Sequence, residues 1–192
     1  AFHDSAERFP YPQYNAVTHK ELYVDTYSWS AEDNPRSKVL WLYGLAGAGK
    51  SGIAKALCQK LAADDRLAGS FFFEKGHPSR GDGNKLFATI AYQLRALKNH
   101  PALRNTIDNA ITDNPLLLSQ SLSGQLQKLI VDPCTANVSD RTLVIVIDGL
   151  DQCENENVLL EILRSIATIS RSDAPLRFFI SSRPDPHIGD AF

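Results

Sequence analysis

The sequence has few cysteines, no long apolar run and no excess of either charge, and each shortage excludes a class of protein. Its three cysteines, Cys58, Cys134 and Cys153, form no Cys-x-x-Cys pair. An odd number at these spacings argues against both a disulfide framework and a zinc site. We therefore expect buried thiols in a reducing compartment, which favours a cytoplasmic protein.

No segment is typical of membrane insertion or export. The apolar run Leu143–Ile147 is far shorter than the roughly 20 residues that span a bilayer as a helix. The first residues lack the basic and apolar regions of a signal peptide, and the chain contains no methionine. We expect no membrane partner, and we expect this sequence to be a piece that begins downstream of a natural initiator.

The charge balance gives no reason to expect a nucleic-acid partner. Twenty Lys and Arg oppose 22 Asp and Glu, which gives a formal net charge of -2 at pH 7. A nucleic-acid-binding domain usually carries a strong basic excess. With 192 residues, of which 43% are hydrophobic, the chain is long enough to bury one ordinary globular core.

What the sequence does contain is a glycine-rich stretch between an apolar run and a helical pattern. Residues 44–51 read Gly-Leu-Ala-Gly-Ala-Gly-Lys-Ser, the G-x-x-x-x-G-K-[ST] spacing of a phosphate-binding P-loop. Val39–Tyr43 precedes the stretch as an apolar strand, and Ile53, Leu57 and Leu61 follow at helical spacing. Because strand, loop and helix are all in place, a chance glycine-rich turn is the weaker interpretation.

The residue types of this stretch suit a phosphate. Glycines keep Cβ atoms away, so that successive N–H groups can converge on its oxygens, and the next helix points its positive end at the same place. Lys50 supplies a mobile charge for the outer phosphates, and the Ser51 hydroxyl can ligate Mg²⁺. The predicted nucleotide-binding residues are Gly44, Gly47, Ala48, Gly49, Lys50, Ser51 and Gly52.

Alternation of apolar strands with helical patterns predicts the fold class. Strands are expected at 39–43, about 69–73, 142–148 and 176–180, and helices after the P-loop, through 84–133 and through 158–169. Strands that are apolar throughout are buried on both faces. The prediction is an α/β fold: a P-loop NTPase three-layer sandwich with a mainly parallel sheet, helices on both faces and a long helical crossover before the Walker B strand.

The N-terminal part is expected to be an arm and a capping helix, residues 1–37, before a core of residues 38–192. The sequence Thr-His-Lys-Glu at 18–21 has the form of a capping box and starts a helix to about Trp29. Its expected packing face is Leu22, Tyr23, Tyr27 and Trp29. In the arm, Tyr11 and Tyr14 are either stacking partners for a nucleotide base or ordinary packing residues.

A second group of polar residues is expected at the same edge of the sheet. Asp148 ends an apolar strand in the manner of a Walker B segment, and ligands of open α/β sheets bind beyond the carboxyl ends of strands. Paired with a P-loop, Asp148 is predicted to hold Mg²⁺ rather than to cap a helix. Asp151 could polarise the attacking water. Arg183, after the last strand, is either a γ-phosphate sensor or a surface arginine.

At this point the residues carry a family resemblance. The chain resembles the NACHT, or nephrocystin-type, NTPase domains abundant in mushroom-forming fungi, from about residue 18 to its end. The blocks that carry the resemblance are residues 39–51, 71–73, 86–94, 147–151 and 179–188.

The resemblance implies a signalling switch of the STAND class, related to NLR-type innate immune receptors. Such domains bind ATP or GTP with Mg²⁺, and their nucleotide state controls self-association and exposure of an N-terminal effector, with C-terminal repeats as sensors. Carried over to this chain, the resemblance implies that Lys50 binds phosphate and that Ser51 and Asp148 serve Mg²⁺. It also implies that Asp151 lies in the acidic patch and that Arg183 is the sensor.

Two departures from the family pattern carry expectations of their own. The family usually has Asp-Glu where this chain has Asp151-Gln152, and a glutamine can orient a water but cannot accept its proton, so we expect slow hydrolysis. The chain also ends shortly after Arg183, before the next strand and the helical domains of the family fold, so we expect reduced nucleotide affinity.

Alternatives from other functional classes stay open on the sequence. One is an actively turning-over AAA-like ATPase or a small-molecule kinase, and another is a degenerate interaction module without hydrolysis. No Asn-Lys-x-Asp guanine-reading motif is present, which disfavours a Ras-like GTPase and leaves ATP and GTP both possible.

Overall fold

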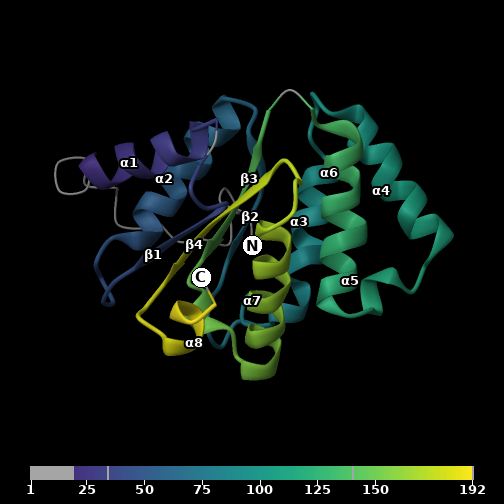
Figure 1. Ribbon diagram of the computed structural model, residues 1–192. Helices are drawn as coiled ribbons and strands as arrows, with labels where there is room; N and C mark the ends of the chain where they lie inside the picture. Colours follow the sequence, from purple (N-terminus) through teal and green to yellow (C-terminus); the bar gives the residue numbers. More distant parts are fainter. Residues whose placement is uncertain (1–19, 34, 140, 192) are drawn as a thin grey trace.

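A computed structural model describes residues 20–33, 35–139 and 141–191 of the chain (Figure 1). The expected N-terminal arm, with Tyr11 and Tyr14, and the start of the capping box lie outside these residues. In chain order the elements are α1 (Lys20–Ala31), β1 (Val39–Tyr43), α2 (Lys50–Ala63), β2 (Leu67–Phe72), η1 (Gly83–Lys85), α3 (Leu86–Arg95), α4 (Pro101–Asp113), η2 (Leu117–Ser119), α5 (Leu122–Leu126), η3 (Gln127–Val131), α6 (Asp132–Asn137), β3 (Leu143–Asp148), η4 (Leu150–Gln152), α7 (Glu156–Ser170), β4 (Leu176–Ser182) and α8 (Pro186–Gly189).

The four strands form one parallel sheet in the order β1-β4-β3-β2, which confirms the predicted α/β architecture. Tyr43 at the end of β1 pairs with Ser182 of β4, and Asp148 at the end of β3 pairs with Ser181 of β4 and Phe72 of β2. All four carboxyl ends therefore lie along one edge. The segments that carry the predicted site residues leave the sheet at this edge.

Side chains that alternate along the strands enter two separate apolar cores. Ile145 and Ile147 of β3 belong to the larger core, whereas Val144 and Val146 belong to the smaller one. Figure 1 shows the reason: α1 and α2 cover one face of the sheet, and α3 to α7 cover the other. The sheet is thus the middle of three layers, which explains why its strands are apolar at nearly every position.

The connection between β2 and β3 is the predicted long helical crossover. It runs from η1 through α6 and supplies much of the larger core, including Leu86, Ile90, Leu103 and Leu129. Pro101 stands at the start of α4, where its missing N–H costs nothing. Among the described helices, none combines the length and the apolar character that crossing a bilayer requires.

Helix α1 packs differently from the prediction. Thr26 and Ser30 are buried, while Leu22 of the expected face is 41% exposed. The hydroxyls of Thr26 and Ser30 donate to the carbonyl oxygens of Leu22 and Tyr27, at 2.7 and 2.6 Å. Small side chains satisfied in this way let the helix backbone approach the core closely, and Tyr27 and Trp29 pack against the smaller core as expected.

The C-terminus of α1 is held by a strand residue. Arg177 of β4 is buried and donates to the carbonyl oxygens of Trp29 at 2.6 Å and Ser30 at 2.7 Å, and also to that of Glu32. The last carbonyls of a helix lack the usual partners within the helix, and these bonds help to satisfy them, together with Arg66, which also donates to the Ser30 carbonyl. A division of the chain at residue 37 stays a prediction.

Candidate functional site

The loop between β1 and α2 has the backbone shape that a phosphate cradle needs. Gly47 and Gly49 have φ values of 79° and 81°, in the left-handed region where a Cβ is unfavourable. The Ala48 N–H donates to the Leu45 carbonyl at 3.2 Å, and the Gly52 N–H donates to the Gly49 carbonyl at 3.0 Å. Gly49 is therefore the N-cap of α2, whose positive end begins directly at the loop.

Lys50 lies folded back over this loop. Its Nζ donates to the carbonyl oxygens of Gly44 at 2.7 Å and Leu45 at 2.9 Å. These are neutral acceptors, and a bond from an ammonium to a phosphate oxygen is stronger than one to a neutral carbonyl. The lysine is thus placed within the loop in a position from which it can exchange its present partners for an anion.

Asp148 is at the end of β3, almost fully buried, with 3% of its surface exposed. The Ser181 hydroxyl donates to its Oδ1 atom, and the Gly149 N–H donates to the same hydroxyl at 3.3 Å. The helical turn that follows, η4, has Gly149 at its N-cap and no side-chain cap. Asp148 is therefore not a helix cap, which was the alternative interpretation of this residue.

Asp151 and Arg183 form a pair across the ends of β3 and β4. Arg183 Nε lies 2.7 Å from Asp151 Oδ2, and the Arg183 backbone N–H donates to Oδ1 at 2.9 Å. The hydrogen bond to Asp151 raises the pKa of Arg183 above its usual value. The side chain of Asp151 is 8% exposed and that of Arg183 is 59% exposed. The structure thus brings together the predicted water-polarising carboxylate and the predicted sensor.

Gln152 faces a different segment. Its Oε1 atom accepts the backbone N–H of Lys75 at 3.3 Å, in the loop that follows β2. Glu154 accepts the next amide of that loop, from Gly76, at 2.8 Å. The segment after β3 is therefore fastened on one side to the loop after β2 and on the other, through Asp151, to the end of β4. The roles of these residues in chemistry stay predictions.

The family profile described as "Nephrocystin 3, N-terminal" matches residues 20–183. This chain belongs to the nephrocystin 3 N-terminal family. The match runs from the first residue of α1 to Arg183, so it contains the P-loop, Asp148 and Asp151 as well.

Other comparisons add little to the family match. No curated protein matches the chain. Among solved structures, it is similar to PCH-2 of C. elegans, with 16% sequence identity and a TM-score of 0.42 over 93% of this chain and 42% of that one. The chain thus spans less than half the length of PCH-2, and the family assignment rests on the profile alone.

Two site residues of this nephrocystin 3 N-terminal domain were not predicted individually. Ser181 bonds to Asp148, and Ser182 accepts the N–H of Gly44, the first P-loop residue, on its carbonyl at 3.3 Å. The Ser182 hydroxyl accepts the indole N–H of Trp41 at 2.8 Å. The sequence did contain a signal, because two serines follow directly on an apolar strand. A hydroxyl buried in such a strand needs a hydrogen-bond partner, which points to polar neighbours at the ends of the adjacent strands.

The donor set at the edge fits a magnesium ion. Mg²⁺ prefers hard oxygen ligands, usually one or two from protein together with phosphate oxygens and water. Ser51 at the start of α2 and Asp148 at the end of β3 supply a hydroxyl and a carboxylate of this kind. Within residues 20–33, 35–139 and 141–191, no group of three or more His, Cys, Asp or Glu side chains is placed to hold a metal ion.

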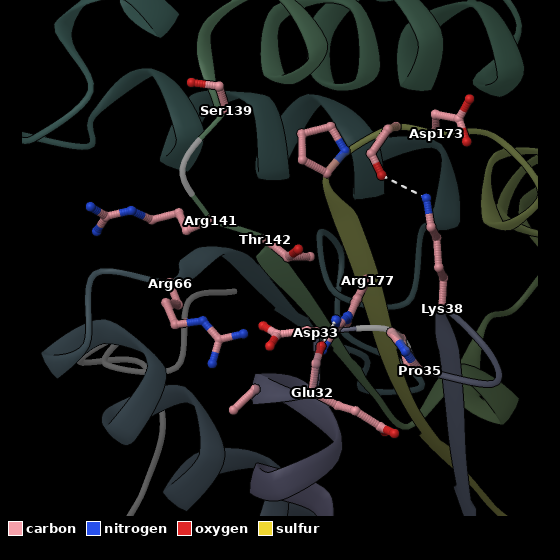
Figure 2. Close-up of a pocket in the computed structure, with 13 residues that line it drawn as sticks. Glu32, Asp33, Pro35, Lys38, Arg66, Ser139, Arg141, Thr142, Asp173 and Arg177 are labelled. Carbon is pink, nitrogen blue, oxygen red and sulfur yellow. Dashed lines mark hydrogen bonds between the residues drawn. The ribbon is translucent and has the colours of Figure 1, made fainter.

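A cavity of about 530 Å³ lies at the opposite edge of the sheet (Figure 2). Its walls include Lys38, Thr142 and Pro175, which directly precede or lie close to the amino ends of β1, β3 and β4. Figure 2 shows Lys38 bonded to a backbone carbonyl, that of Ala174 at 2.9 Å, and Arg177 is committed to the end of α1. These cations bond backbone carbonyls, and the cavity is a seam between α1 and the amino ends of the strands, at the edge opposite Asp148.

Proposed function

We propose that this domain is a nucleotide-binding switch that binds ATP or GTP together with Mg²⁺ and hydrolyses it slowly. The observation that carries the proposal is the convergence at one sheet edge of a P-loop, with two left-handed glycines and Lys50, and the buried carboxylate of Asp148. A Gly-rich loop at a helix N-terminus is suited to phosphate, and a carboxylate beside it is suited to the metal that accompanies phosphate.

In this proposal Lys50 and Arg183 exchange present contacts for the nucleotide, and Ser51 and Asp148 serve the metal. Lys50 leaves the carbonyls of Gly44 and Leu45 for the outer phosphates. Ser51 and Asp148 hold Mg²⁺, which neutralises charge on the phosphates when it is bound. Arg183, whose side chain is mostly exposed, leaves Asp151 for the γ-phosphate.

In this proposal the Asp151–Arg183 pair is the resting state of the switch. While the pair is formed, both Asp151 oxygens accept bonds from Arg183, Oδ2 from the guanidinium Nε and Oδ1 from the backbone N–H, so the carboxylate is held away from a water. A γ-phosphate would compete for the guanidinium and release the carboxylate toward water. Self-association controlled by nucleotide in the longer protein, in the manner of STAND switches, is part of the same proposal.

Binding without hydrolysis is a second candidate function. The observation in its favour is that Gln152 cannot accept a proton and that its carbonyl oxygen is already bonded to Lys75. If the domain does hydrolyse the nucleotide, Asp151 would have to act as base without Gln152. Release of phosphate from bound triphosphate separates the two candidates.

The test is calorimetric titration of the purified domain with ATP and with GTP, with and without Mg²⁺. The Lys50→Ala variant should bind triphosphate about 10- to 100-fold more weakly, because bonds from a charged donor are worth roughly 1.5–3 kcal/mol. Lys98→Ala is the matched control, since it removes an exposed lysine between α3 and α4. Equal affinity of Lys50→Ala and Lys98→Ala in the presence of Mg²⁺ would refute the P-loop assignment.

A further inference from the structure

Two buried polar side chains meet between the central strands at the site edge. Asp148 of β3 is 3% exposed, and Ser181 of β4 is fully buried. The two residues are partners in the parallel pairing of β3 and β4, and the Ser181 hydroxyl donates to Asp148 Oδ1. A buried carboxylate whose neighbour is a fixed strand residue has little freedom to turn.

The direction of the hydrogen bond between Ser181 and Asp148 follows from a second contact of the serine, with Gly149. The Gly149 N–H lies 3.3 Å from the Ser181 Oγ atom, and a backbone N–H can only donate. That contact therefore uses a lone pair of the hydroxyl oxygen and leaves its single proton for Asp148. Because Gly149 and Asp148 are adjacent in the chain, the serine clamps the end of β3 at both a backbone and a side-chain atom.

We propose that Ser181 is a positioning residue for the metal site: its hydroxyl holds one oxygen of Asp148 and so orients the carboxylate toward Mg²⁺ bound with the nucleotide. This inference rests on the proposed function. Hydrogen-bond partners of metal-ligating carboxylates orient the ligand, and their loss typically lowers metal affinity by about 10- to 100-fold.

The effect of Ser181 should be confined to the metal. In the proposed site, Lys50 and backbone amides contact the phosphate. Ser181 bonds to Asp148 and Gly149, whereas Ser182 contacts the loop through its carbonyl, which accepts the N–H of Gly44. Removing the Ser181 hydroxyl therefore leaves the phosphate cradle unchanged. A role in strand packing alone would lower stability without altering the dependence on Mg²⁺.

The experiment measures nucleotide affinity as a function of Mg²⁺ concentration for wild type, Ser181→Ala and Ser165→Ala. Ser165 is the control because it is a buried serine on α7 whose hydroxyl donates to a carbonyl of its own helix, that of Glu161, at 2.7 Å. We expect Ser181→Ala to raise the Mg²⁺ midpoint about ten-fold and to leave affinity without Mg²⁺ unchanged. Mn²⁺ spectroscopy of the nucleotide complex gives a readout independent of hydrolysis.

A more conservative variant keeps the test decisive if the alanine variant folds poorly. Ser181→Cys keeps a donor at the same position, although a weaker one on a larger atom, so its Mg²⁺ midpoint should lie between those of wild type and Ser181→Ala. Wild-type midpoints in Ser181→Ala and Ser181→Cys would overturn the positioning role and leave the proposed function standing. Absence of nucleotide binding by wild type with or without Mg²⁺ would overturn both.

Discussion

Replacement of Arg177 by methionine should loosen α1 and lower the stability of the whole domain. The buried guanidinium donates to three backbone carbonyls at the C-terminal end of α1, those of Trp29, Ser30 and Glu32. Arg177→Met keeps an unbranched side chain that can fill the same space, and it removes every donor. The change therefore tests the hydrogen bonds and not the packing.

The expected loss of unfolding free energy in Arg177→Met is smaller than the loss of three hydrogen bonds would suggest. A bond from a charged donor contributes roughly 1.5–3 kcal/mol, but the Ser30 carbonyl also accepts from Arg66, and Glu32 is exposed, so its carbonyl can turn to water. Removing a buried charge also relieves a desolvation cost. We expect a net loss of about 2 kcal/mol, which corresponds to a Tm lower by about 4–8 °C in a domain of this size.

The assay is thermal and urea unfolding of wild type, Arg177→Met and the control Arg36→Met, which removes an exposed arginine from the connection between α1 and β1. Hydrogen exchange should speed up selectively in the amides of α1. If Arg177→Met and Arg36→Met unfold at the same temperature, the guanidinium bonds only balance their desolvation, and the reasoning is refuted.

Three further predictions concern single side chains. Gln152→Glu should raise the rate of phosphate release with Mg²⁺, because it restores a proton acceptor; a rate no higher than wild type would show that the missing acid is not limiting. Hydrogen bonds, first from Lys60, lower the pKa of Asp64 below its usual 3.8. The ionised Asp64 therefore stabilises the fold at pH values above 3.8, and this stabilisation is lost as the pH falls through the lowered pKa. The difference in urea midpoint between wild type and Asp64→Asn should therefore vanish in strong acid, and a difference that persists there would contradict this account. Burial raises the pKa of Cys134 to about 12, so a thiol reagent at mildly alkaline pH should label the half-exposed Cys153 first and Cys134 only after unfolding, as mass spectrometry would show; early labelling of Cys134 would be evidence against a closed core.

The strands and their burial could be predicted because the physical signal is local. Val144 to Ile147 are apolar at every position, which fits only a strand covered on both faces, and the two cores receive alternate residues as expected. The strand and helix on either side of the glycine-rich loop could be predicted for the same reason, since the glycines, Lys50 and both elements lie within one short segment. The phosphate-binding role of the loop stays a prediction.

The contacts within the site depend on strand order, which periodicity does not specify. Asp151 and Arg183 are 32 residues apart, and they meet only because β4 lies next to β3. The same adjacency brings Ser181 to Asp148. The packing face of α1 was predicted wrongly at Leu22, which helical spacing favoured, whereas burial of Thr26 depends on a hydroxyl bond to the helix itself.

The position of β4 between β1 and β3 also has a consequence for synthesis on the ribosome. Figure 1 shows β1, in blue, beside β4, in yellow. Trp41 of β1 bonds to Ser182 of β4, which is 141 residues later in the chain. At about 5–20 residues per second, β1 emerges on the order of 10 seconds before the strand that pairs with it. The loop after β1 therefore gains this support only after β4 has been made, and a chain interrupted before β4 would carry residues 44–51 without the strand residue that bonds to Gly44.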